Sequence, residues 1–137
     1  MKIFSEKVNY GLLALIELAK NYYQGHIQIK DIANSQNIPK SYLEQLLVLL
    51  KNSELVESKR GAQGGYKLKI APKNIKVIDL IKAFERPINF VDYSKISETL
   101  QVYWKEIETK FIKLFDDTLE DLINRELHLN QNNFYQI

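Results

Sequence analysis

Hydrophobic residues recur with helical spacing between residues 39 and 52. Four leucines at positions i, i+3, i+4 and i+7 form one apolar stripe, namely Leu43, Leu46, Leu47 and Leu50. The opposite side is short-chained or hydrogen-bonding, with a lysine at each end: Ser41, Glu44, Gln45 and Val48, flanked by Lys40 and Lys51. This pattern predicts an amphipathic helix whose leucine stripe is buried and whose polar face is free to contact another molecule.

A shorter helix of about two turns is predicted just before it. Ile29, Ile32 and Ala33 supply its apolar positions, and Asn37 ends it because asparagine tolerates the left-handed conformation. Two helices joined by so short a turn must cross steeply, which is helix-turn-helix geometry. An ordinary helix hairpin in an α-helical core would show the same pattern, so this segment alone leaves both structures open.

A glycine-rich hairpin is predicted next. Short strands are expected at residues 56–58 and 66–70, around Arg60-Gly61-Ala62-Gln63-Gly64-Gly65, whose glycines permit positive φ angles and close approach to a surface. Residues 58–77 contain six basic residues and no acid: Lys59, Arg60, Lys67, Lys69, Lys73 and Lys76. A helix-turn-helix followed by a basic hairpin is a winged helix, suited to phosphate and minor-groove contact. A nucleotide-phosphate loop would require Gly-Lys-Ser/Thr and a long helix here, and neither follows.

Two more helices complete a predicted winged domain over residues 1–88. The first covers residues 5–21 and buries one face, made of Val8, Leu12, Leu15, Ile16 and Ala19. The second repeats the helical stripe after the hairpin, at Val77, Leu80, Ile81 and Phe84, and Pro87 stops it. Residues 88–94 are expected to form a linker to a second region, residues 89–137.

The longest helical pattern of the chain covers residues 94–125. One seam contains Ile96, Leu100, Tyr103, Ile107, Phe111, Leu114, Thr118 and Leu122, widened by Trp104, Phe115, Leu119 and Ile123. A single helix of this length would measure roughly 45 Å and could not be covered by the winged domain. The simplest partner for so wide a stripe is the same helix in a second copy. Folding back onto its own domain is the alternative. Residues 130–137 are expected to form a polar, frayed tail.

Composition places this organisation in a soluble, cytoplasmic protein. The 137 residues are 45% hydrophobic and 26% charged, and nothing resembles a signal peptide or a membrane span. The net charge of +2 is uneven: residues 1–70 hold ten Lys/Arg against six Asp/Glu, and residues 71–137 hold nine against eleven. The basic half therefore coincides with the predicted helix-turn-helix and wing.

Catalytic and metal chemistry find little support. The chain has no cysteine, which excludes disulfides, thiolate catalysis and cysteine-ligated metal. The carboxylates Asp116, Asp117, Glu120 and Asp121 cluster, but the Glu-x-x-His pairs of di-metal helix bundles are absent, so we expect solvated acids. Ser41 has no histidine partner at a recognisable spacing. We predict that the protein is not an enzyme.

Three motifs now acquire a specific meaning. Ser41-Tyr42-Leu43-Glu44-Gln45-Leu46, then Leu55-Val56, then Arg60-Gly61 and Gly64-Gly65-Tyr66 resemble the signature of the Rrf-two family of bacterial regulators. The resemblance is close over the first 88 residues and extends to the C-terminal helix only in pattern. It implies a mainly α fold, a winged helix-turn-helix with a small two-stranded wing and a long C-terminal dimerisation helix. It also implies a homodimeric transcriptional regulator that binds double-stranded DNA in a sequence-specific manner.

The resemblance implies DNA-contacting roles for Ser41, Glu44, Gln45 and Arg60, and the helical pattern assigns the first three independently. We place Lys40 and Tyr42 near phosphates. The remaining predicted DNA-binding residues belong to the wing: Lys59, Gly64 and Gly65. Ala62 and Gln63 depart from the Pro-Gly usual in the family, which leaves the conformation of the tip open.

Family members that sense iron–sulfur status or nitric oxide hold a cluster with cysteines in the linker region. Residues 88–103 of this chain contain no thiol, so we predict no cofactor. The chain would then resemble the cofactor-free repressor of cysteine metabolism in that family, controlled by a partner protein or by a small-molecule effector.

Two other functions stay open. A winged helix can serve as a protein–protein interaction module, with the basic wing gripping an acidic partner. Alternatively, an aromatic linker pocket could bind a small molecule, lined by Phe84, Phe90, Tyr93, Tyr103 and Trp104. Those aromatic residues would equally fit the core of a dimer.

Overall fold

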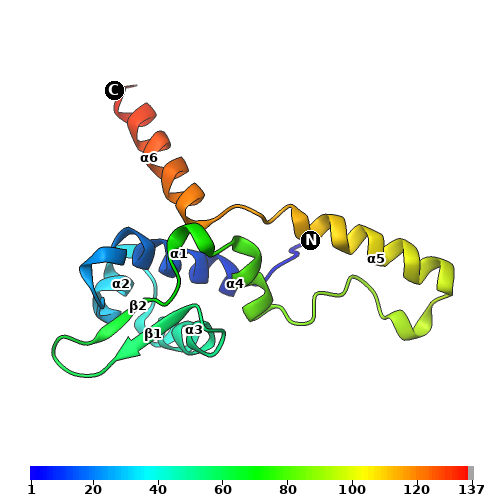
Figure 1. Ribbon diagram of the computed structural model, residues 1–137, viewed down its shortest axis with the longest axis horizontal. Helices are drawn as coiled ribbons and strands as arrows, with labels where there is room; N and C mark the ends of the chain where they lie inside the picture. Colours follow the sequence, from blue (N-terminus) through cyan, green and yellow to red (C-terminus); the bar gives the residue numbers. More distant parts are fainter. Residues whose placement is uncertain (136–137) are drawn as a thin grey trace.

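The computed structural model describes residues 1–135, a mainly helical chain with one small antiparallel sheet (Figure 1). In chain order the elements are α1 (Glu6–Lys20), η1 (Tyr22–Gln24), α2 (Ile29–Gln36), α3 (Lys40–Asn52), β1 (Val56–Lys59), β2 (Gly65–Leu68), η2 (Pro72–Asn74), α4 (Val77–Phe84), η3 (Tyr93–Lys95), α5 (Glu98–Lys113) and α6 (Leu119–Tyr135). Helices α1 to α4 and the hairpin gather in one body, from which α5 and α6 extend in different directions (Figure 1). The predicted fold class, a winged helix-turn-helix, is confirmed.

The leucine stripe of α3 lies in the core of this body. Its four leucines are each at most 1% exposed, and they form one cluster with buried residues of α1, α2 and α4. Gly11 lets α1 approach α4 closely, because a Cβ at this position would lie 2.4 Å from a carbon of the Phe84 ring. Burial of apolar surface is the dominant favourable term in folding, so this stripe fixes which face of α3 remains outside.

The turn between α2 and α3 has the conformation that the sequence predicts. Asn37 adopts φ 54° and ψ 48°, within the left-handed region. The next amide, Ile38 N–H, donates to the Ala33 carbonyl at 3.0 Å, and the Ile38 side chain is buried. The two helices are thus joined by the short turn that a helix-turn-helix requires.

The wing pairs β1 with β2 in antiparallel register, from Val56 opposite Leu68 to Lys59 opposite Gly65. Strand β1 is one residue longer than expected, and β2 begins one residue earlier and ends two earlier. A third segment joins the sheet: Ile27 and Tyr66 exchange two backbone hydrogen bonds, each 2.8 Å long. The sequence pattern does not predict this attachment.

The structure divides the helix expected over residues 94–125 into two. Helix α5 ends at Lys113 and α6 begins at Leu119. Between them Thr118 and Asp121 cap each other: Thr118 Oγ1 accepts from the Asp121 N–H at 3.1 Å, and the Asp121 carboxylate accepts from the Thr118 N–H at 2.9 Å. This reciprocal cap starts a new helix where the seam appeared continuous.

The segment between α5 and α6 is fastened to the start of α4. Leu119 N–H donates to the Ile75 carbonyl at 2.9 Å, and Val77 N–H donates to the Asp117 carbonyl at 2.9 Å. The Leu119 side chain is fully buried in the core. Further apolar residues on both sides of the break pack against the same core: Ile112, Phe115, Leu122 and Ile123. Folding back, the alternative to a second copy, thus holds for this part of the predicted seam.

The acidic cluster has structural partners. Asp116 pairs with Lys76 at 2.6 Å, Asp117 pairs with Arg125 at 3.0 Å, and Asp121 serves as the cap described above. These acids lie at the start of α6, where carboxylates favour the positive end of the helix dipole. Over residues 1–135 no three His, Cys, Asp or Glu side chains are placed to hold a metal ion.

Helix α6 continues to Tyr135, through most of the tail expected to be frayed, and Gln136 and Ile137 lie outside the described residues. Within the described part, none of the helices is sufficiently long and apolar to cross a membrane.

Candidate nucleic-acid interface

The outward face of α3 carries the side chains predicted to contact DNA. Ser41, Glu44 and Gln45 are exposed, as is Lys40 at the start of the helix. The carboxylate of Glu44 forms no ion pair within residues 1–135, with Lys40 or with any other cation. A surface pair with Lys40, one turn away, therefore does not account for an acid on this face.

Tyr42 differs from these neighbours because its ring is half-buried against α1. The ring meets Tyr10 edge-to-face, with 5.4 Å between the ring centroids. Burial, and then the negative charge of Glu6, raises the pKa of Tyr42 above its ordinary value. A phenol is protonated at neutral pH even at its ordinary pKa, so Tyr42 is a hydrogen-bond donor, which suits the predicted phosphate contact.

A cleft of about 530 Å³ separates α3 from the wing. It collects six of the predicted residues: Lys40, Glu44, Lys59, Arg60, Gly64 and Gly65. Ser41, Tyr42 and Gln45 do not line it. The start of α2 also lines the cleft, with residues that the sequence did not indicate as part of the DNA-binding site, namely Gln28, Ile29 and Lys30. The feature of the sequence that could have indicated this part of the site is Lys30, a cation in the first turn of α2.

The basic tract of residues 58–77 divides into paired and unpaired cations. Lys67 pairs with Glu57, Lys69 with Glu54 and Lys76 with Asp116. The other three, Lys59, Arg60 and Lys73, form no ion pair with any described residue. Although residues 58–77 contain no acid, half of their cations are paired with carboxylates from other parts of the chain. The unpaired cations nearest α3 are those that border the cleft.

Two glycines of the wing are required by its packing. A Cβ on Gly64 would lie 2.2 Å from the Lys59 carbonyl oxygen, and a Cβ on Gly65 would lie 2.2 Å from that of Ile27. Gly65 also adopts φ +137°, which side chains other than glycine rarely permit. A larger residue at position 64 would distort the turn of the wing itself, and one at position 65 would push the wing away from the segment before α2, so both glycines shape the cleft whether or not they touch DNA.

Comparison with known proteins assigns this architecture to a family. Residues 4–125 match the family model Rrf2, described as an iron-dependent transcriptional regulator.

The chain belongs to the Rrf2 family.

The predicted resemblance to this family is thereby confirmed. The HTH-type transcriptional regulator CymR of Bacillus subtilis strain 168 is 42% identical over 124 residues, which cover 89% of each protein. The solved structure of CymR, the global cysteine regulator of B. subtilis, has a TM-score of 0.77 at 38% identity, covering 91% of this chain and 98% of that one. The structure of T. potens IscR gives a TM-score of 0.74 at 34% identity, covering 92% and 88%. This Rrf2 protein is therefore a winged-helix DNA-binding transcriptional regulator and not an enzyme.

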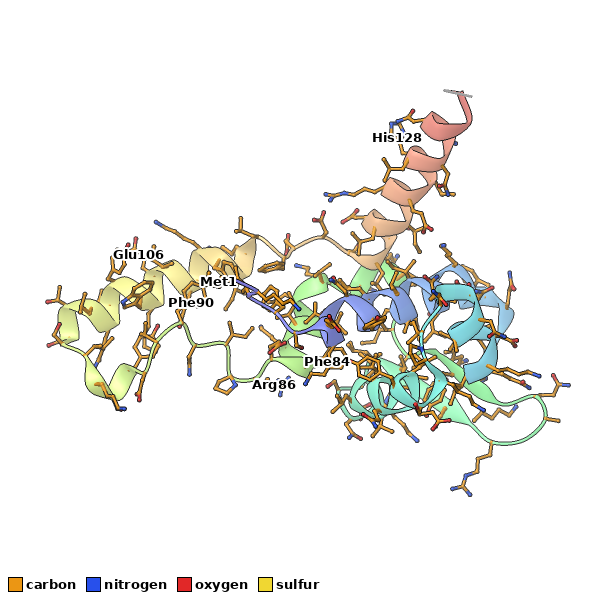
Figure 2. The ribbon with its side chains drawn as sticks, turned by 180° about the vertical axis from the view of Figure 1, so that it is seen from behind. Met1, Phe84, Arg86, Phe90, Glu106 and His128 are labelled. Carbon is orange, nitrogen blue, oxygen red and sulfur yellow. The ribbon has the colours of Figure 1, made fainter. Side chains whose placement is uncertain are left out.

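The aromatic linker of this Rrf2 protein only partly forms the predicted pocket. A cleft of about 250 Å³ lies between the N-terminal segment and the linker, and Phe84 and Phe90 line it. The other three predicted residues do not: Tyr93, Tyr103 and Trp104. Their place is taken by Phe4 and Phe111, and the polar rim includes Arg86 and Asn89. Figure 2 shows Phe84, Arg86 and Phe90 along the path that joins the winged body to α5.

Helix α5 holds the linker through a buried carboxylate. Glu108 is 8% exposed, and its Oε1 accepts a hydrogen bond of 2.6 Å from the Phe90 N–H. Tyr93 lies beside the same group, and burial together with the Glu108 carboxylate raises the pKa of Tyr93 to about 12. This hydrogen bond joins the linker to α5.

Proposed function

We propose that this Rrf2 protein is a homodimer that binds specific DNA sequences, with α3 in the major groove and the wing in the adjacent minor groove. The observation that carries the proposal is the cleft between them, where the polar face of α3 meets unpaired cations of the wing and of α2. If the cations that line this cleft were paired with carboxylates of the protein, a purely structural role would have been favoured. Unpaired cations around an exposed helix suit a polyanion.

The roles follow from position. Ser41, Glu44 and Gln45 face base edges, Lys40 and Tyr42 lie near phosphates, and Arg60 with the glycine tip reaches the minor groove. Lys59 supports the wing contact as a phosphate-binding cation. Lys30 at the start of α2 joins this set, because it lines the same cleft.

The dimer would form through α5, which extends from the winged body (Figure 1). Three large apolar residues of this helix are exposed in the single chain: Leu100 at 46%, Val102 at 63% and Tyr103 at 52%. Leu114, just after the helix, is 71% exposed. Apolar residues at this density on one exposed helix mark an interaction surface, and a two-fold related copy of the same helix is the simplest complement.

Selection of bound fragments from the source genome, followed by footprinting, tests the proposal. A sequence-specific footprint, with an affinity that falls steeply as salt rises, is expected. A protein–protein interaction module would instead retain DNA weakly and without sequence preference. That second outcome would contradict the assignment of Ser41, Glu44 and Gln45 to base edges.

Glu44 gives a prediction about specificity. Phosphates repel a carboxylate on a DNA-facing surface, but a carboxylate can accept from cytosine N4 and reject a neighbouring acceptor. Glu44→Ala should therefore broaden the sequences bound, with about 1–3 kcal/mol less discrimination at one base pair. Randomised-site selection with the wild type and the variant measures this, and an unaltered preferred motif would refute it.

The residues of this chain do not fit an iron–sulfur cluster, although the family description mentions iron. A cluster needs soft thiolate ligands, and the chain contains no cysteine. We expect the protein to purify without colour, iron or acid-labile sulfide, even under anaerobic conditions. Anaerobic reconstitution with iron and sulfide, followed by visible spectroscopy and operator titration, is the measurement. A stable chromophore that changes DNA affinity would overturn the expectation.

The regulatory signal then comes from a partner protein or a small-molecule effector. The cleft beside Phe90 favours the second, because aromatic side chains line it together with the oppositely charged Arg86 and Glu85, a lining that suits a small molecule with both apolar and polar groups. An occupant would act on the linker, and through Glu108 on α5. It must favour one spacing of the two recognition helices over another, since a ligand without that preference shifts nothing.

A further inference from the structure

The base of the wing is held by backbone hydrogen bonds. Ile27 and Tyr66 exchange two of them, each 2.8 Å long, and Gly65 allows the two segments this close an approach. These bonds leave the outer part of the hairpin, residues 61–63, beyond their reach. Inside the tip a single backbone bond closes the turn, from the Gly64 N–H to the Gly61 carbonyl at 2.9 Å.

Among the described residues, the side chain of Gln28 connects the tip to the body. Gln28 Nε2 donates a hydrogen bond of 3.1 Å to the Ala62 carbonyl, across 34 positions of sequence. Gln28 also borders two hollows: the cleft facing α3, and a second hollow of about 310 Å³ formed with His26, Ala62 and Gln63. The wing tip therefore has a hollow on each side. The Gln28 side chain lies between the two hollows and joins the start of α2 to the tip.

Local structure does not explain a glutamine at this position. Gln28 is the N-cap residue of α2, yet its side chain forms no cap hydrogen bond. Serine, threonine, aspartate or asparagine would cap α2 better. The tip itself contains no proline that would restrict its backbone. The long amide reaches the tip carbonyl instead of serving its own helix.

We infer that Gln28 is a positioning residue for DNA recognition: it sets the height of the wing tip above the cleft, so that Arg60 and the tip meet the minor groove together with α3. This inference rests on the proposed DNA-binding function. Gln28, the N-cap residue of α2, would then affect specificity for the base pairs beneath the wing. Recognition of the base pairs contacted by α3 would not depend on Gln28.

Three variants test the inference: Gln28→Ala, Gln28→Met, which keeps the length but cannot donate, and Gln24→Ala as a matched control on an exposed glutamine of η1. We expect both Gln28 variants to bind the selected operator about 5- to 10-fold more weakly, the loss that one net hydrogen bond represents. Backbone amides of residues 61–64 should exchange faster in the free protein. Base preference should relax beneath the wing and persist beneath α3, and Gln24→Ala should match the wild type.

Other outcomes separate the possible failures. Weaker binding with unchanged amide exchange would make Gln28 a direct DNA contact and overturn the positioning role. Faster exchange with unchanged affinity and base preference would show a connection that DNA recognition does not use, and would overturn it equally. If the wild type binds no sequence specifically, the proposed function fails. If the wild type binds and the Gln28 variants match it, only the present inference fails.

Discussion

Placing two charges on the exposed face of α5 should convert the protein to a monomer and weaken operator binding by a factor on the order of 10² or more. The double variant Leu100→Glu and Tyr103→Glu does this at positions three residues apart, on one face of the helix. In the single chain these side chains are 46% and 52% exposed. The substitutions therefore leave the winged core intact, and they introduce charge repulsion across a two-fold interface.

The expected loss is large because a dimer engages two half-sites, and the second contact is made at high effective concentration. Light scattering at micromolar concentration measures the oligomeric state, and titration of a labelled operator measures the affinity. Thr109→Glu, which adds a charge at another exposed position of α5, is the control. A wild-type protein that sediments as a monomer would contradict the dimer itself. A monomeric double variant with unchanged affinity would contradict the need for two half-sites.

Substitution is a better test than truncation after the winged domain. A division of the chain at residue 88 suggests that the second region can be removed, but Leu119 is fully buried in the core of the first. The segment around it is also hydrogen-bonded to the start of α4. Deleting residues 89–137 would uncover that core and would confuse loss of the dimer with loss of the fold.

The helix break at residues 114–118 shows where the hydrophobic pattern reaches its limit. The seam over residues 94–125 is regular enough for one helix, because two helices packed on different surfaces can carry apolar residues at similar spacing. A local signal was nevertheless present: Thr118 followed three residues later by Asp121, with Glu120 between them, is an N-terminal capping sequence. Periodicity reports which residues are buried, whereas caps report where a helix begins.

The DNA-facing side of α3 could be derived from sequence because a single rule decides it. Four leucines define the buried stripe, and the remaining positions must then face outward. The attachment of the wing to α2 could not be derived in this way. The contacts of Ile27 with Tyr66 and of Gln28 with Ala62 join segments more than 30 positions apart. Neither pair follows a local periodicity. Which cations of the basic tract are paired could not be predicted for the same reason, because Lys76 and Asp116 come together only in the folded chain.

Arg60→Ala should weaken operator binding by roughly 5- to 150-fold, corresponding to about 1–3 kcal/mol for one specific contact. The side chain is exposed and pairs with no carboxylate among residues 1–135, so its loss should leave the thermal midpoint close to that of the wild type. Arg60→Lys should recover only part of the affinity, because lysine keeps the charge but not the planar fork of donors. Differential scanning calorimetry and operator titration on the same preparations separate the two effects.

Lys67→Ala provides the matched control for Arg60, because it removes a cation from the same hairpin. Lys67 pairs with Glu57 across the two strands at 3.3 Å, so its positive charge is already partly neutralised within the protein. Its removal should cost much less affinity.

The salt dependence then distinguishes the kind of contact that Arg60 makes. A phosphate contact would lower the slope of log K against log salt by about one for every sequence tested. Insertion into a narrow minor groove would instead cost most at operators with A·T-rich flanks, where the negative potential is strongest. Equal losses for Arg60→Ala and Lys67→Ala, or a midpoint that falls as far as the affinity, would mean that Arg60 supports the hairpin rather than binding DNA.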